Sequence, residues 1–202
     1  MHPNPVFHDR DDAENLAFAA ERGFGVLAVS AEGAPMLAHV PFVLEGRVAE
    51  LHLMRSNPIA RALSGPVAAR IAVSGPDGYV SPDWYGTADQ VPTWNYVAVH
   101  LTGRLERLAD AELRGVLERL SEAFEARLAP KPAWRMEKME PDALARMMRM
   151  VARFRFTVEA VEGTWKLAQN KPEGARLGAA EGIEASGIGF EVAALAALMR
   201  GV

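Results

Sequence analysis

The stretch with the clearest chemical character is residues 74–103, SGPDGYVSPDWYGTADQVPTWNYVAVHLTG. It holds two of the four tryptophans, all three tyrosines and three prolines, but no lysine or arginine. Large rings held among turn-forming residues can make the walls of a binding site for a flat organic ligand. They can also form an aromatic flap over a barrel end or a dimer contact, and residue types alone favour that structural role. The rings belong to Tyr79, Trp84, Tyr85, Trp94 and Tyr96.

A second group of residues could bind an anion. Arg55, Ser56 and Asn57 follow a predicted strand and lead into a short helical sequence that begins at Pro58. Asparagine is a good N-cap and proline suits the first helical position, so free backbone N–H groups and the helix dipole would favour a phosphate beside the arginine. A well-capped helix without any ligand explains the same pattern, and both interpretations stay open.

Several kinds of chemistry have no support in the sequence. There is no glycine-rich nucleotide fingerprint, no G-x-S-x-G elbow and no H-E-x-x-H motif. The chain has no cysteine, which excludes disulfides, thiol nucleophiles and cysteine-based metal sites. His39, His52 and His100 fall on three different predicted strands without the spacing of a metal site. We therefore assign no catalytic residue and no metal ligand.

The composition is that of a soluble globular protein. The chain has 202 residues, half of them hydrophobic, and a formal net charge of −4, so the chain as a whole is not a polyanion binder. The N-terminus is polar, and no apolar run approaches the roughly 18 residues of a membrane span. These features predict a cytoplasmic protein that does not contact a membrane.

The periodicity of the apolar residues predicts a mainly β fold with flanking helices, in the α+β class. Six strands that are neighbours in sequence predict a largely antiparallel sheet, as a closed or split barrel with helices outside. We expect one domain over residues 1–202, with a helical insert at about 109–150 and a helical tail at about 172–202. In the second helix of the insert, Leu144, Met147 and Met148 should face the core. The strands are expected at 23–30, 36–44, 48–54, 66–74, 94–108 and 151–163, and further helices at 9–22 and after Pro58.

Five motifs, in order along the chain, resemble those of a known family. They are HVPF at 39–42, LHLMRSNP at 51–58, GPDGYVSPDWY at 75–85, VPTWNYVAVH at 91–100 and GTWKLAQNK at 163–171. The set is similar to the signature of the PaiB-type FMN-binding negative transcriptional regulators, which have a split-barrel fold. Two positions depart from that family's usual pattern: Asp77-Gly78 replaces His-Ala, and Ala168 stands where serine is common.

The resemblance implies a homodimer with FMN bound between the subunits. The flavin phosphate would be bound at residues 55–57, and the rings at 84, 85 and 94 would supply flat apolar walls. Polar groups after the last predicted strand would bind the ring edge, with Lys166 placing positive charge near N1 and C2=O. The implied cofactor-binding set is Arg55, Ser56, Asn57, Trp84, Tyr85, Thr93, Trp94, Lys166, Gln169 and Asn170.

Three functions of different class remain open at this point. The first is a flavin-binding regulator. Residues 127–155 contain eight basic residues and three acidic ones and could face nucleic acid, although the pattern favours a solvated helix face. The second is an FMN-dependent oxidoreductase, similar to the pyridoxamine-phosphate oxidases or flavin reductases. The third is a flavin-free dimeric sensor or scaffold. No helix-turn-helix pattern is present.

Overall fold

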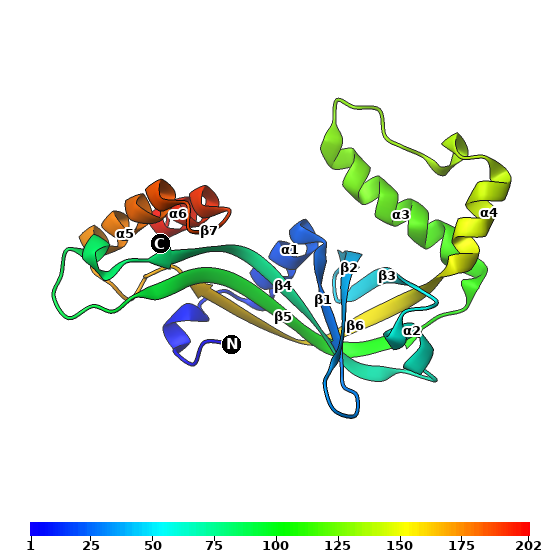
Figure 1. Ribbon diagram of the computed structural model, residues 1–202, viewed down its shortest axis with the longest axis horizontal. Helices are drawn as coiled ribbons and strands as arrows, with labels where there is room; N and C mark the ends of the chain where they lie inside the picture. The colour runs from blue at the N-terminus through cyan, green and yellow to red at the C-terminus, as the bar shows by residue number, and fades with distance from the viewer. The chain divides into compact units, whose positions relative to one another are not determined.

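The computed structural model describes residues 1–202 (Figure 1). The strand order is β1-β2-β3-β6-β5-β4-β7, and β1 also pairs with β4. This additional pairing closes the first six strands into a nearly complete antiparallel ring, which confirms the expected α+β class and barrel-like sheet. The strands are β1 (Phe24–Val29), β2 (Met36–Glu45), β3 (Val48–Met54), β4 (Val67–Val80), β5 (Thr93–Arg107), β6 (Val151–Lys166) and β7 (Gly189–Phe190).

The chain divides into two compact units. Unit 1 comprises Met1–Asn15, Ser74–Val99 and Glu162–Val202, and unit 2 comprises Leu16–Val73 and His100–Val161. None of the helices combines the length and the apolar character needed to cross a bilayer. The α-helices are α1 (Asp12–Arg22), α2 (Pro58–Ala62), α3 (Leu113–Glu125), α4 (Pro141–Met150), α5 (Glu173–Ser186) and α6 (Val192–Arg200).

Unit 2 is organised around strands that bury alternate residues. In β2 every second side chain is buried, and the register places Phe42 opposite the equally buried Leu51 of β3. Strands β5 and β6 approach closely at Gly103, where a Cβ atom would lie 1.9 Å from the carbonyl oxygen of Thr157. Only glycine fits such a backbone contact, so Gly103 fixes the packing of these two strands.

Helix α3 is held on unit 2 by apolar packing and by ion pairs. Arg153 of β6, whose side chain is 5% exposed, donates to Glu112 at 2.7 Å, just before α3. Glu50 of β3 accepts a hydrogen bond of 2.8 Å from Arg119 of α3. The buried guanidinium is tolerated because it is paired. The apolar side of the helix buries Leu113, Val116 and Leu120.

Helix α4 does not pack as the sequence suggested. No residue of this helix is buried, and the side chain of Met147 is 58% exposed. Leu144 and Met148 are half-buried, so the prediction that Leu144, Met147 and Met148 face the core was wrong for Met147. Amphipathic spacing defines an apolar helix face, but it does not guarantee a neighbouring element that covers it.

Strand β4 runs six residues further than expected, into unit 1. The segment 75–80 contains glycine, proline and aspartate, which are typical of turns. In the structure Asp77 and Gly78 instead pair with Phe190 and Gly189 of β7. The C-terminal segment therefore adds a short strand to this edge, and the aromatic stretch begins as strand rather than loop.

The C-terminal tail contains two helices that pack against each other. Helices α5 and α6 lie together in Figure 1, next to β7. Arg176 of α5 is buried and donates a hydrogen bond to the carbonyl oxygen of Met199 in α6. Small buried residues let the two helices approach closely: Ala175, Ala179 and Ala180 in α5, and Ala196 in α6.

Candidate functional site

The polar groups of unit 1 gather around a pocket of about 280 Å³ at the end of β6. Its walls come from the N-terminal arm (residues 1–8), from the segment that precedes β5 and from the residues that follow β6. Of the predicted cofactor-binding residues, Tyr85, Thr93, Lys166 and Asn170 line this pocket. Other polar lining residues were not anticipated: His2, Asn4, Asp89, Gln90, Asn95 and Lys171.

Lys166, the last residue of β6, forms hydrogen bonds with the first two residues of β5. Its Nζ donates to the hydroxyl of Thr93 at 2.5 Å and to the carbonyl oxygen of Trp94 at 2.8 Å. Burial lowers the pKa of Lys166, and the nearby charge of Lys171 lowers it further. The pocket therefore contains an oriented and partly desolvated ammonium group, which an anion or a carbonyl-rich ring edge would stabilise.

A second ammonium group, that of Lys171, also lines the pocket. Lys171 Nζ is 5.1 Å from the ring centroid of Tyr85 and donates to Gln90 Oε1 at 2.5 Å. Burial raises the pKa of Tyr85, so its hydroxyl stays neutral beside this cation. Lys171 and Tyr85 thus form a cation–π pair that places a charge and a flat ring together.

Gln169 holds the pocket together rather than offering a free amide. Its Oε1 accepts from the backbone N–H of Leu167 at 2.8 Å. Its Nε2 donates to the carbonyl oxygens of Val6, at 3.1 Å, and Trp165, at 2.7 Å. Both amide hydrogens are therefore used to join the N-terminal arm to the end of β6. A direct contact between this side chain and a cofactor stays a prediction.

Trp84 packs on the C-terminal helix α5. A Cβ atom at Gly182 would lie 2.2 Å from Trp84 Cδ2, and one at Gly178 would lie 2.5 Å from the Trp84 carbonyl oxygen. The two glycines, one helical turn apart, form a groove for the indole and its backbone. One face of Trp84 is therefore covered by protein, which limits the ring to at most one open face for a ligand.

Tyr79 connects the two tryptophans of the aromatic stretch. Its ring centroid is 6.3 Å from those of both Trp84 and Trp94, in edge-to-face arrangements. The side chain of Trp94 remains 46% exposed. The three rings form a rigid row in unit 1, and Trp94 is its accessible end.

The predicted phosphate-binding residues lie in unit 2. Asn57 caps α2, because its Oδ1 accepts from the backbone N–H of Ile59 at 2.9 Å. Arg55 donates to Asp110 at 2.7 Å and to the carbonyl oxygen of Arg149, at the end of α4, at 2.9 Å. The arginine already binds one carboxylate, so its part in a phosphate site stays a prediction, as does that of Ser56.

Comparison with known proteins identifies the family. Residues 1–160 match the family described as "Putative FMN-binding domain". The chain belongs to this family. Protease synthase and sporulation protein PAI 2 of Bacillus subtilis is 28% identical over 174 residues, which cover 84% of this chain and 83% of the relative. This confirms the resemblance inferred from the sequence motifs.

Solved structures show that the fold is shared with flavin-binding proteins. The FAD and heme binding protein of Mycobacterium smegmatis aligns with a TM-score of 0.57 and 19% identity, covering 89% of this chain and 80% of that one. A conserved hypothetical protein of Mycobacterium tuberculosis aligns with a TM-score of 0.56 and 15% identity, covering 85% and 94%. At these identities the likeness concerns the fold alone.

The donor set of the pocket is compatible with the cofactor in the FMN-binding family's name. Two ammonium groups, Lys166 and Lys171, and the amide of Asn170 line the same pocket as Tyr85, and Lys171 lies against its ring. Such groups suit the oxygen-bearing edge of an isoalloxazine, which offers acceptors to N–H donors. Three of these four residues lie beyond residue 160, so the family match itself does not include them.

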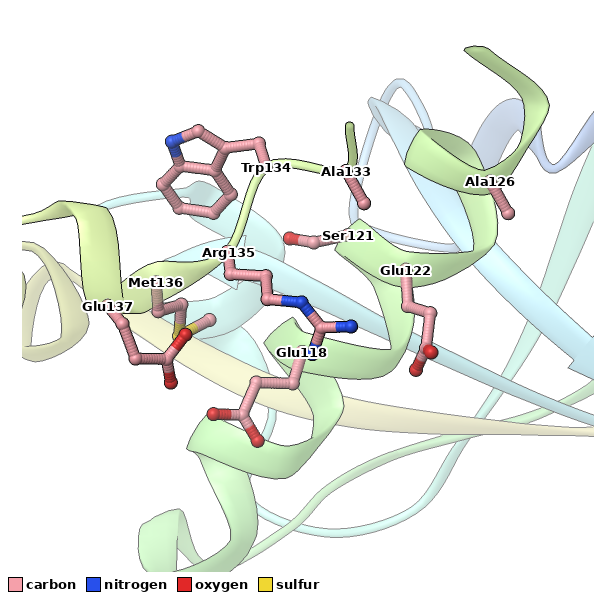
Figure 2. Close-up of a pocket in the computed structure, with 9 residues that line it drawn as sticks. All are labelled: Glu118, Ser121, Glu122, Ala126, Ala133, Trp134, Arg135, Met136 and Glu137. Atoms are coloured by element: carbon pink, nitrogen blue, oxygen red, sulfur yellow. The ribbon is translucent and has the colours of Figure 1, made fainter. Parts of the chain in front are cut away.

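Unit 2 contains a separate pocket of about 360 Å³ beside α3 (Figure 2). Trp134 and Arg135 lie on the segment that follows this helix, and Glu118 and Glu122 project from the helix itself. Glu118 already accepts a hydrogen bond of 2.7 Å from Arg114. The lining combines both signs of charge, and neither the sequence motifs nor the FMN-binding family points to a ligand for it.

Proposed function

We propose that the protein binds FMN and that the unit 1 pocket holds the oxygen-bearing edge of the flavin ring. The observation that carries this proposal is the Lys166 ammonium group, which is partly buried, fixed by two acceptors and accompanied by Lys171. A desolvated cation in a pocket is unfavourable unless a ligand or partner compensates it. Bound flavin would supply redox chemistry, and the cation would stabilise negative charge on the ring edge.

The remaining parts of the cofactor are assigned to the other predicted residues. Arg55, with the backbone around Ser56 and Asn57, is the proposed phosphate group. Trp94, the exposed end of the aromatic row, is the proposed wall for the ring. The chain's own residues would thus bind, orient and shield the flavin, and none of them is assigned a proton-transfer role.

A homodimer is part of this proposal. In unit 2 the outer face of β1 and β2 is apolar: Phe24 is 51% exposed and Leu37 is 61% exposed. The register sets Leu37 beside Ala28, and the ring of Phe24 stacks on His39 with 6.3 Å between centroids. An exposed apolar sheet face is typical of a protein–protein contact, and the occupant proposed here is a second copy of the chain.

The proposed cellular role is regulation of transcription. The Bacillus subtilis relative is named a protease synthase and sporulation protein. Direct DNA binding would have to use the exposed basic residues of residues 127–155, such as Arg146 and Arg149, because Arg153 and Lys131 already form ion pairs with acids. An electrophoretic shift on promoter DNA that weakens steeply with salt would support it; no shift at low salt would exclude it.

The test of cofactor binding is an absorbance spectrum of the purified protein before and after FMN soaking and desalting. Retained flavin absorbance at close to one equivalent per chain is expected, together with thermal stabilisation by added FMN, worth about 2.7 kcal/mol at a hundredfold excess over Kd. Colourless protein would favour a flavin-free scaffold. Anaerobic NADH or NADPH would bleach the flavin of an oxidoreductase and leave that of a pure regulator yellow.

A further inference from the structure

The side chain of His8 lies between two backbone carbonyl groups of unit 1. Its Nδ1 is 2.5 Å from the carbonyl oxygen of Gly163, near the end of β6. Its Nε2 is 2.5 Å from the carbonyl oxygen of His2, in the N-terminal arm. A carbonyl oxygen can only accept, so each contact requires an N–H on the imidazole. The neutral ring carries one N–H and the imidazolium carries two, so only the protonated ring makes both bonds.

We infer that protonated His8 latches the N-terminal arm against the unit 1 pocket and that loss of this proton loosens the arm. The arm matters to the pocket because His2 and Asn4 form part of its lining. When His8 is neutral, one ring nitrogen presents a lone pair to a carbonyl oxygen, and the latch becomes repulsive at that end. The consequence for a ligand rests on the proposed flavin function, whereas the latch itself does not.

His2 has the opposite role from His8. The Nδ1 of His2 accepts a hydrogen bond of 3.1 Å from the backbone N–H of Asn4, so this nitrogen carries no proton. Burial, Lys166 and His8 all lower the pKa of His2, which keeps its ring neutral. The neutral ring of His2 stabilises the fold of the arm, whereas the inferred latch requires a protonated ring at His8.

The other attachments of the arm do not depend on a histidine proton. Gln169 donates to the carbonyl oxygen of Val6 at 3.1 Å. The backbone N–H of His2 reaches the hydroxyl of Thr164 only at 3.4 Å, a long and weak contact. The latch therefore controls chiefly the beginning of the arm, where His2 and Asn4 meet the pocket, while Val6 stays attached.

A proton must be present on both ring nitrogens for the latch to be complete, so loss of one proton as the pH rises loosens the arm. Ligand affinity at the pocket should then fall about tenfold if one charge-assisted hydrogen bond is lost.

The experiment is an NMR pH titration of the full chain without flavin, following the His8 ring nitrogens and the backbone amides of Asn4, Val6 and Phe7. Wild type is compared with His8→Gln, which cannot titrate. In wild type the Asn4 amide signal should shift together with the His8 ring. In H8Q it should stay at the high-pH position of wild type.

Two results would overturn the latch: a His8 ring that titrates without any change in the arm signals, or an H8Q arm that matches low-pH wild type.

A parallel titration uses riboflavin, which has no phosphate to titrate. Loss of affinity with rising pH in wild type but not in H8Q is expected. Affinity independent of pH, with a titrating arm, would contradict control of the pocket. Absence of riboflavin and FMN binding at every pH would instead refute the proposed function and leave the arm data to decide the latch.

Discussion

The ammonium nitrogen of Lys166 lies 2.8 Å from the backbone carbonyl oxygen of Trp94, a residue 72 positions earlier in the chain. This bond fixes the end of β6 to the start of β5 and places the cation at a defined point of the pocket. Two hydrogen bonds to fixed acceptors restrict the conformations of the lysine side chain before a ligand binds, which lowers the entropic cost of binding. The pair therefore explains how a flexible side chain can act as a preorganised donor.

Replacement of Lys166 with methionine should weaken FMN binding by at least about tenfold, because a charge-assisted hydrogen bond contributes roughly 1.5–3 kcal/mol. Methionine keeps much of the apolar stem, so the fold should survive. Flavin fluorescence quenching measures the affinity, and Lys138→Met, at an exposed lysine of unit 2, is the matched control. Equal affinity in K166M and wild type would remove this residue from the site.

Replacement of Lys171 with glutamine should raise the pKa of Lys166. The charge of Lys171 is the second cause, after burial, of the lowered pKa, and its removal makes protonation of Lys166 more favourable. Wild type should therefore begin to lose the Lys166 charge at a lower pH than the K171Q variant. NMR titration of the lysine side chains detects the shift; an unchanged or lower value in K171Q would show that the two ammonium groups do not interact.

Alanine at Gly182 should destabilise the protein by about 1–3 kcal/mol, because its Cβ would overlap the Trp84 ring that lies in the groove of α5. Gly174, in the same helix, has open space around it. Gly174→Ala should be neutral or stabilise by up to about 1 kcal/mol through helix propensity. Urea denaturation midpoints compare the two variants, and similar midpoints would show that Trp84 does not pack on this helix.

Charge reversal at Arg55 should abolish FMN retention if this residue binds the phosphate. The matched variant is Asp110→Asn, which removes the carboxylate that Arg55 contacts at 2.7 Å. Freed from its partner, Arg55 should bind the phosphate at least as well, so D110N should retain FMN. Retention by R55E after desalting would place the phosphate elsewhere and leave Arg55 as a cap for the end of α4.

A charge on the outer face of β1 and β2 should separate the proposed dimer. Leu37→Glu places a carboxylate in the middle of the exposed apolar patch, where a second copy would have to bury it. Sedimentation velocity should show a dimer for wild type and a monomer for L37E. Glu45→Gln, at the exposed end of β2, should stay dimeric. Wild type that sediments as a monomer at micromolar concentration would contradict the dimer.

Local patterns predicted most of the strands well. Strand β3 matches its expected bounds because Leu51 and Leu53 alternate with polar residues between clear turns. The predicted end of strand β4 was too early, because Pro76 and Gly78 are typical turn residues and the pairing of Asp77 and Gly78 with the distant β7 is not visible in the local sequence. Met147 of α4 was also mispredicted as inward-facing, because helical periodicity carries no information about which element covers the apolar face.

The candidate site could be predicted only in part, because some of its residues lie in a recognisable motif and others come together only in the folded chain. Lys166 and Asn170 stood in a motif, and Lys171 shared that motif without being selected. Nothing in the sequence connected His8 with Gly163, 155 residues away, because such a contact arises only when the arm packs on β6. The covering of Trp84 by α5 likewise depends on Gly182, whose role is visible only once the two elements meet.

The most direct test of the central claim is an FMN titration followed by the backbone amide signals of the full chain. If the unit 1 pocket holds the flavin ring edge, the largest saturable shifts will fall in residues 166–171 and 85–95. These shifts should be lost in K166M. Saturable binding with its largest shifts at residues 118–137, around the pocket of unit 2, would contradict the account.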